Sequence, residues 1–325
     1  MRELEYLRLE VAIIGGGIAG LTTAAALRKA GHRIYEQSMF SNEVGAAIHC
    51  APNATRILSW LGFDFEKAKA VKNVRGFQAD GETTEVLGDT SLTHIEQVYG
   101  FPWYFFHRVD LHDGLKEVAF GERGDGYPVK LKLQYRCVSV DSSAGIATFE
   151  NGESVRADVI IGADGIHSTV AKFVVDGGEA KAQETGQSAF RFLVPVERLM
   201  QDEETRWLVD GVPDTMNIFR SEDRRLVAYP CRNSTLMNFV GIHPETSPES
   251  SKEGKPSWRW PCRPPRSDRD VGQLILTPYR FRVESKGKAG GPDAGLLELS
   301  SSISRFMQAS KQADAVLLIQ SFNQH

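Results

Sequence analysis

The sequence is poor in cysteine and has no long apolar run, and both shortages exclude classes of protein. Four cysteines occur among 325 residues, none of them in a C-x-x-C pair: Cys50, Cys137, Cys231 and Cys262. Such spacing favours reduced thiols over a disulfide framework or a zinc site. No stretch approaches the roughly 18 apolar residues of a transmembrane helix. Charged residues interrupt the start of the chain, where a signal peptide would need an apolar core. We therefore expect a cytoplasmic protein without a membrane span.

An excess of one charge and the motifs of several enzyme classes are also missing. The formal net charge of −4 gives no reason to expect a nucleic-acid partner. Neither a G-x-S-x-G serine elbow nor a G-x-x-x-x-G-K-[ST] phosphate loop occurs. His107 and His112 do not have the i, i+4 spacing of a helical metal pair, so we expect no metal site. The length suits one large or two modest domains.

What the sequence does contain is a glycine-rich turn near its start. Residues 11–14, Val-Ala-Ile-Ile, predict a buried parallel strand, and residues 21–29 predict a helix. Between them, Gly15 permits a tight turn, Gly17 lets the backbone approach a pyrophosphate, and Gly20 lets the helix lie close to the sheet. The N-terminus of the helix favours the negative charge of a diphosphate. The segment therefore predicts a dinucleotide-binding turn.

An acidic residue completes this pattern. Residues 32–36 predict a second strand, and Glu36 at its end can accept hydrogen bonds from the hydroxyls of an adenosine ribose. The alternative is a glycine-rich turn in an unrelated α/β protein, which G-x-G-x-x-G alone would leave open. With strand, helix and acid in register, we favour the dinucleotide site.

A second strand ends in a polar turn. Residues 157–168 predict a buried strand followed by Asp164-Gly165. An aspartate at the tip of a strand, beside a glycine, can bind ribityl hydroxyls or bridging waters. The alternative is an ordinary turn after a core strand, which the glycine turn upstream makes the weaker interpretation.

Strand signals dominate the middle of the chain. We expect a helix over 107–118 and a β-meander over 129–140, 146–149 and 154–161. Four further strands predict a second sheet: 189–194, 215–219, 225–230 and 236–242. Residues 246–293 are rich in Pro, Gly, Ser and basic side chains. For them we favour a solvated linker over a basic patch that binds an anionic partner.

Six segments together carry a resemblance to a known family. They are Gly15–Gly20 with Glu36; Glu43–Ile48 with Pro52-Asn53 and Arg56; His107–His112; Gly162–Gly165 with Ser168; Ala189-Phe190-Arg191; and Tyr229–Arg232. From residue 10 to about 245, the chain resembles the FAD-dependent aromatic-ring monooxygenases, and among them the fungal salicylate-hydroxylase-like enzymes. The resemblance implies an α/β fold, with a Rossmann-like FAD-binding domain of the aromatic hydroxylase type and a second β-sheet domain for the substrate.

The resemblance also implies FAD as cofactor and NAD(P)H as co-substrate. Its cofactor-binding positions are Gly15, Gly17 and Gly20 at the pyrophosphate, Glu36 at the adenosine ribose, Gly45 and Ala47 beside the isoalloxazine, Arg108 at the ribityl–pyrophosphate region, and Asp164 with Gly165. Arg191 and Tyr229 would line the substrate face as catalytic residues. An arginine fork can hold a carboxylate or phenolate, and a tyrosine hydroxyl can orient a ring or relay a proton. The alternatives are a strand ion pair and a half-buried core tyrosine.

The resemblance, together with the composition and spacing after residue 245, gives the expected domains. They are an FAD-binding domain at 1–75 and 105–178, a substrate-binding sheet at 76–104 and 179–245, an irregular basic insertion at 246–293, and a partial C-terminal helix of the FAD domain at 294–325. The family's late G-D-x-A-H-x-x-x-P segment, whose aspartate binds the ribityl chain, does not occur. We therefore expect a chain that is truncated before this segment.

The expected function is that of an FAD-dependent monooxygenase. It would hydroxylate or epoxidise a small aromatic or related secondary-metabolite substrate with NAD(P)H and O₂. Two alternatives stay open: a simple flavin or NAD(P) oxidoreductase, and a truncated, non-catalytic remnant of such an enzyme.

Overall fold

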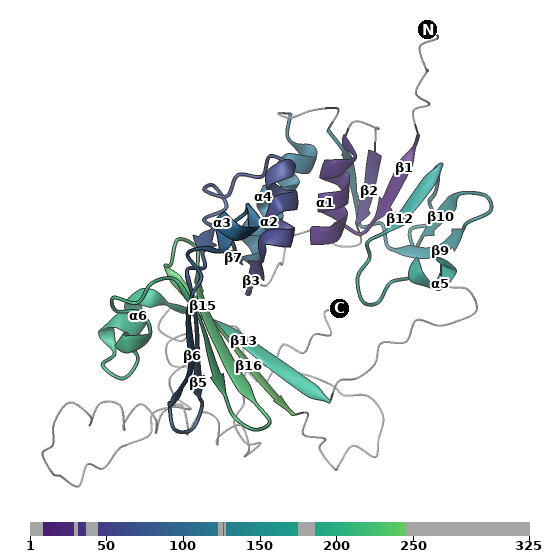
Figure 1. Cartoon of the computed structure of the whole chain (residues 1–325). Helices are drawn as coiled ribbons and strands as arrows, with labels where there is room; N and C mark the ends of the chain where they lie inside the picture. Colours follow the sequence, from purple (N-terminus) through teal and green to yellow (C-terminus); the bar gives the residue numbers. More distant parts are fainter. Residues whose placement is uncertain are drawn as a thin grey trace, which may run out of the picture. The chain divides into compact units, whose positions relative to one another are not determined.

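The structure is a computed structural model, and it divides into two units (Figure 1). It describes residues 9–28, 32–36, 45–122, 126, 128–174 and 186–244. Of the residues that the structure describes, unit 1 contains those up to Val74, those between Ser91 and Val174, and Pro230–Asn238, whereas unit 2 contains Arg75–Thr90, those between Gly186 and Tyr229, and Phe239–Pro244. The predicted basic insertion at 246–293 and the predicted helix at 294–325 lie outside the described residues.

Unit 1 is built on a parallel sheet of four strands in the order β12-β1-β2-β8. The strands are β1 (Val11–Ile14), β2 (His32–Glu36), β8 (Lys130–Leu133) and β12 (Val159–Gly162). All three pairings are parallel, and Ile14 stands opposite both Gly162 and Tyr35. The carboxyl ends of β1, β2 and β12 therefore meet at one edge of the sheet, which is where α/β sheets bind ligands.

Alternate residues of β1 enter two different cores. Val11 and Ile13 pack with Leu21 of α1 (Ile18–Ala26) and Leu115 of α4 (Arg108–Phe120). On the other face, Ala12 and Ile14 pack with residues of a small antiparallel sheet in the order β11-β10-β9. Its strands are β9 (Cys137–Asp141), β10 (Ile146–Phe149) and β11 (Ser154–Arg156). Covering on both faces explains why β1 reads as a continuous apolar run.

The predicted three-stranded meander was wrong in its outer strands. The segment 154–161 is two strands: β11 pairs with β10, whereas β12 leaves for the parallel sheet. The change occurs at Asp158, whose backbone N–H donates to the carbonyl of Glu10 (2.8 Å) and whose carboxylate accepts from the N–H of Glu10 (2.8 Å). Likewise, 129–140 divides into β8 and β9, which belong to different sheets. An apolar alternation fits either sheet, so it does not reveal the switch.

Among the described residues, the rest of unit 1 contains a second small sheet and three further helices. Three antiparallel strands stand in the order β3-β7-β4. They are β3 (Ala47–Cys50), β4 (Val71–Lys72) and β7 (Tyr104–His107), and the helices α2 (Pro52–Trp60), α3 (Ile95–Tyr99) and α5 (Ala171–Val174) complete the unit. Pro52 begins α2, where its missing N–H costs no hydrogen bond.

Unit 2 contains most of a six-stranded sheet in the order β13-β16-β15-β14-β5-β6. The strands are β5 (Arg75–Asp80), β6 (Val86–Ser91), β13 (Gln187–Pro195), β14 (Thr215–Arg220), β15 (Arg225–Cys231) and β16 (Leu236–Pro244). The short helix α6 (Val196–Gln201) and a 3₁₀ turn (Arg206–Leu208) follow β13. Phe192 stacks on Phe239 across β13 and β16, with ring centroids 5.0 Å apart.

The boundaries of the units differ from the expected domains at two places. Residues 91–104 and 230–238 belong to unit 1, although the sequence interpretation assigns both to the second sheet. No helix in the described ranges is long and apolar enough to cross a membrane.

Candidate functional site

The glycine turn occupies the ligand-binding edge of the parallel sheet, directly after β1. Gly15 has φ +108°, and a Cβ there would overlap the backbone carbonyl of Ala163. A Cβ at Gly20 would overlap the carbonyl oxygen of Gly15. A Cβ at Gly17 would meet no described atom within 4 Å. Two of the three glycines are therefore required by the fold itself, whereas Gly17 faces open space.

That open space is where a diphosphate would have to approach. Gly17 is the N-cap of α1, with φ −70° and ψ −174°, and no side chain caps the helix. The first N–H groups of a helix attract anions when no side chain satisfies them. The residues present therefore fit the pyrophosphate of a dinucleotide such as FAD.

Glu36 closes the turn from the end of β2. Its side chain is 8% exposed, and its carboxylate accepts a hydrogen bond from the backbone N–H of Gly16. On the other side, Nε2 of the buried His112 lies 2.8 Å from the carbonyl oxygen of Gly16. The turn is thus held between a strand end and helix α4. The sequence analysis gave His112 no role here, although the segment His107–His112 is part of the family resemblance.

Asp164 and Gly165 lie beside the glycine turn, as the parallel pairing of β12 with β1 requires. One carboxylate oxygen of Asp164 accepts from the Ser168 hydroxyl (2.6 Å), and the other accepts from the N–H of Thr169 (2.7 Å). A carboxylate that accepts such bonds organises the chain into α5, as an N-cap would. Gly165 has φ +78° and is exposed.

A second group of predicted residues gathers at the start of α4. The N–H of Arg108 donates to the carbonyl of Ala46 (2.8 Å), and Ala47 stands directly opposite His107 in the β3–β7 pair. A Cβ on Gly45 would overlap the His107 ring. The small residues of the loop are therefore needed for the backbone to pass beside His107.

His107 is a buried support for this loop that sequence reasoning did not identify. Its side chain is 6% exposed, and its Nδ1 has no hydrogen-bond partner among the described residues. Burial lowers the pKa of His107, and the nearby positive charge of Arg232 lowers it further. The ring is therefore neutral at pH 7 and contacts the loop as an uncharged group.

The two predicted catalytic residues lie on the sheet of unit 2. Arg191 is on β13 and half-buried, and Tyr229 is on β15 and 5% exposed. Strand β16 separates the two strands. Arg191 points to the face opposite Phe190 and Phe192, because successive side chains alternate across a strand.

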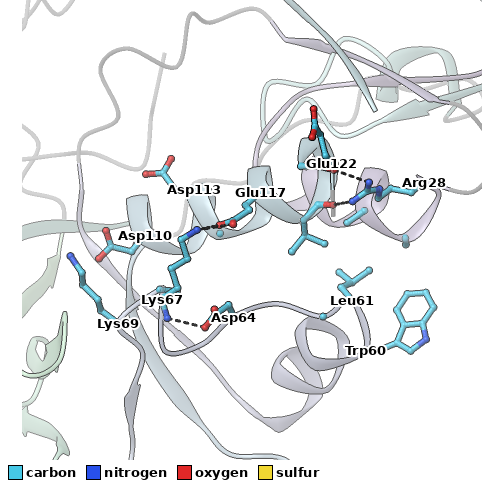
Figure 2. Close-up of a pocket in the computed structure, with 17 residues that line it drawn as sticks. Arg28, Trp60, Leu61, Asp64, Lys67, Lys69, Asp110, Asp113, Glu117 and Glu122 are labelled. Atoms are coloured by element: carbon cyan, nitrogen blue, oxygen red, sulfur yellow. Dashed lines mark hydrogen bonds and ion pairs between the residues drawn. The ribbon is translucent and has the colours of Figure 1, made fainter. Parts of the chain in front are cut away.

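A groove of about 900 Å³ in unit 1 has a different lining (Figure 2). It lies between the end of α1, the turn after α2 and one side of α4. Lys67 forms an ion pair with Glu117 there, at 2.6 Å. In the described part of the chain, none of the predicted site residues lines this groove. The groove therefore shares no described residue with the predicted cofactor site.

A metal centre has no candidate ligands in the described ranges. No group of three or more His, Cys, Asp or Glu side chains there could hold a metal ion. Comparison with family models gives no match. Comparison with individual proteins is more informative.

Several curated proteins are similar to this chain. Hispidin-3-hydroxylase of Neonothopanus nambi is 34% identical over 75% of this chain and 61% of its own length. The FAD-dependent monooxygenase cfoG of Aspergillus candidus is 35% identical over 73% of this chain and 56% of its own length. The 3-amino-4-hydroxybenzoate 2-monooxygenase PtnB3 of Streptomyces platensis is 30% identical over 85% of this chain and 67% of its own length. The chain thus spans less than two thirds of the first two relatives.

Solved structures share the fold. An HpxO variant from Klebsiella pneumoniae, complexed with FAD, has a TM-score of 0.61 and 20% identity, covering 90% of this chain and 66% of that one. The tetrameric form of 2-methyl-3-hydroxypyridine-5-carboxylic acid oxygenase has a TM-score of 0.59 and 23% identity, covering 75% of this chain and 61% of that one. With the glycine turn, Glu36 and the Asp164-Gly165 turn at one sheet edge, these similarities show that the chain belongs to the FAD-dependent monooxygenases that include the aromatic-ring hydroxylases.

Proposed function

We propose that this protein is an FAD- and NAD(P)H-dependent monooxygenase that hydroxylates or epoxidises a small aromatic substrate. The observation that carries the proposal is the meeting of three strand ends at one edge. Gly17 faces open space there, Glu36 closes the turn, and Asp164-Gly165 lies alongside. A nicotinamide dehydrogenase would need the glycine turn at Gly15–Gly20, but it would not need the loop at 45–47 or the second sheet.

Each chain segment has a separate part in this proposal. The turn at Gly15–Gly20 and the N-terminus of α1 hold the diphosphate, and Glu36 accepts hydrogen bonds from the ribose. The loop at 45–47 provides a close backbone surface for the ring system. Arg108, at the first position of α4, supplies a positive charge toward the ribityl–pyrophosphate region.

The substrate residues are proposed on unit 2. An arginine at position 191 can hold the carboxylate or phenolate of an aromatic compound in a fixed plane. The hydroxyl of Tyr229 can donate to or accept from a ring hydroxyl, and can move its proton. Three relatives support a hydroxylated aromatic substrate, because their names specify a 3-amino-4-hydroxybenzoate.

When FAD is bound, it would accept a hydride from NAD(P)H and activate O₂. The chain's own residues bind the cofactor, exclude water from it, and orient the aromatic ring. We also propose that the protein works in the cytosol, because the three described cysteines are free and buried. Fractionation of cells that express the tagged protein tests this location.

The test of the activity is a turnover experiment with ¹⁸O₂. Protein reconstituted with FAD is mixed with NAD(P)H and a panel of hydroxybenzoates, aminohydroxybenzoates and hydroxypyridines. A monooxygenase places one ¹⁸O atom in the product and the other in water. An oxidase would give labelled H₂O₂ and no labelled product, and a dehydrogenase would give product without flavin. Folded protein that stays colourless after addition of FAD would indicate a non-catalytic remnant.

A further inference from the structure

The turn between β15 and β16 has an unusual backbone. Arg232, Asn233 and Ser234 all have positive φ, at 53°, 53° and 58°. Non-glycine residues rarely adopt this conformation, and three in succession carry strain that surrounding contacts must offset. The N–H of Thr235 donates to the carbonyl of Arg232 (3.1 Å) and closes the turn. Strained backbone of this kind concentrates where a structure needs a group in a fixed place.

The turn is fastened to α4 by a two-pronged ion pair. Nε of Arg232 donates to one carboxylate oxygen of Asp110 (2.7 Å), and Nη2 donates to the other (2.8 Å). The hydrogen bonds to Asp110 raise the pKa of Arg232, so the guanidinium stays charged. A further bond runs from the N–H of Asn233 to the carbonyl of Lys69 (3.1 Å). Because Asp110 is two residues beyond Arg108, the turn is held at the same end of α4 as the loop at 45–47, which we call the cofactor loop.

Strand β16 follows this turn and places Asn238 beside the cofactor loop. Asn238 is fully buried, and its Oδ1 accepts a hydrogen bond from the N–H of Ala47 (3.1 Å). In the β3–β7 pair, the N–H of Arg108 already donates to Ala46, so the facing residues Ala47 and His107 form a non-hydrogen-bonded pair. The N–H of Ala47 therefore points away from β7 and toward Asn238.

The choice of asparagine at 238 needs an explanation. Its Nδ2 is buried and has no hydrogen-bond partner among the described residues. A leucine would fill a similar volume without leaving a buried donor unsatisfied. The acceptor for Ala47 is what an asparagine adds here, and a leucine could not supply it.

We propose that the segment 232–238 positions the cofactor loop, with Arg232 and Asn238 as its positioning residues. The Arg232–Asp110 pair fixes the turn on α4, and Asn238 then sets the orientation of the Ala47 backbone. The role of the cofactor loop at the isoalloxazine rests on the proposed function. The hydrogen bond from the Ala47 N–H to Asn238 is observed in the structure and does not depend on that function.

The test uses Asn238→Leu in the full chain. Asn73→Leu is the matched control, because Asn73 is 1% exposed and both of its side-chain polar atoms are unpartnered among the described residues. Backbone hydrogen exchange at 45–50 is followed without flavin. We expect exchange at Ala47 to be at least about fivefold faster in Asn238→Leu, as expected for the loss of one hydrogen bond, and unchanged in Asn73→Leu. Unchanged exchange in Asn238→Leu, or equal acceleration in both variants, would overturn the proposal.

The flavin-loaded protein gives a second measurement. Asn238→Leu should retain FAD but shift the flavin absorption bands and raise the share of NAD(P)H oxidation that ends in H₂O₂ by severalfold. Arg232→Gln, at a partly exposed position, should shift exchange, spectrum and coupling in the same direction, and it replaces Asn238→Leu if that variant does not fold. If wild-type protein binds no FAD, the proposed function fails and the exchange data alone decide. Normal bands and coupling in both variants would contradict the role at the flavin.

Discussion

The carboxylate of Glu36 accepts a hydrogen bond from the backbone N–H of Gly16, which joins the end of β2 to the glycine turn. Both residues are buried. The residue that sequence reasoning assigns to the adenosine ribose therefore also holds the turn that would receive the diphosphate. One substitution should affect stability and cofactor binding together.

We expect Glu36→Ala to lower the free energy of unfolding by about 1.5–3 kcal/mol, because the buried N–H of Gly16 loses a charged acceptor. Glu36→Gln keeps an oxygen acceptor and should cost less than half as much. Urea unfolding measures the first effect, and an FAD titration should show weaker binding for both variants. Equal stability of Glu36→Ala and wild type would mean that this hydrogen bond does not support the turn.

Substitutions at Gly15 and Gly17 should have different effects, one on the stability of the fold and the other on the affinity for FAD. Gly15→Ala should destabilise by about 2–5 kcal/mol, because it combines a positive φ with overlap on the Ala163 carbonyl. Gly17→Ala should keep wild-type stability, since its Cβ meets no described atom within 4 Å. Its FAD affinity should still fall at least tenfold, or about 1.4 kcal/mol, because the methyl group occupies the diphosphate space. Thermal unfolding and an FAD titration test the pair.

The local sequence was sufficient to predict the glycine turn, but it was insufficient to predict the long-range contacts around the candidate site. Gly15, Gly17 and Gly20 are separated by fixed short spacings, so the turn could be predicted from the sequence alone. Asn238 reaches Ala47 from a position 191 residues away, and no periodicity links the two. The same holds for β12, which was expected to continue a meander but pairs in parallel with β1. Strand character was predictable, whereas the choice of partner depends on the whole fold.

The two residues on unit 2 should affect different kinetic constants. Tyr229→Phe removes only a hydroxyl from a buried ring, and kcat should fall about 100-fold or more if that hydroxyl moves a proton. Arg191→Lys loses the planar fork and should raise KM for carboxylate- or phenolate-bearing substrates by about tenfold. Steady-state kinetics with the flavin-loaded protein provide both constants. If kcat is unchanged in Tyr229→Phe, then Tyr229 is a core tyrosine.

The buried thiols should make stability depend on alkaline pH. Burial raises the pKa of Cys50 from 9.0 to about 11 and that of Cys231 from 9.0 to about 12. Between pH 9 and 12 the folded protein therefore keeps protons that the unfolded chain loses, so the free energy of unfolding falls as pH rises. A Cys50→Ser/Cys231→Ser double variant should show a smaller fall. Urea unfolding at pH 8 to 11 measures the slopes.

The same shifts should make both thiols slow to react. At pH 8 the thiolate population is about 100-fold lower for Cys50 and about 1,000-fold lower for Cys231 than for an ordinary cysteine. Modification by a disulfide reagent, read by mass spectrometry at each site, should therefore be much slower in the native protein than in the unfolded chain. Rapid modification of Cys231 in folded protein would contradict its burial.

The central claim is that this chain holds FAD through the glycine turn, and a flavin absorbance measurement tests it most directly. Wild-type protein and Gly17→Ala are incubated with excess FAD, separated from free flavin by gel filtration, and scanned near the flavin bands, with circular dichroism to confirm equal folding. We predict about one FAD per wild-type chain and much less in Gly17→Ala. Equal flavin content in the two folded proteins, or none in either, would contradict the claim.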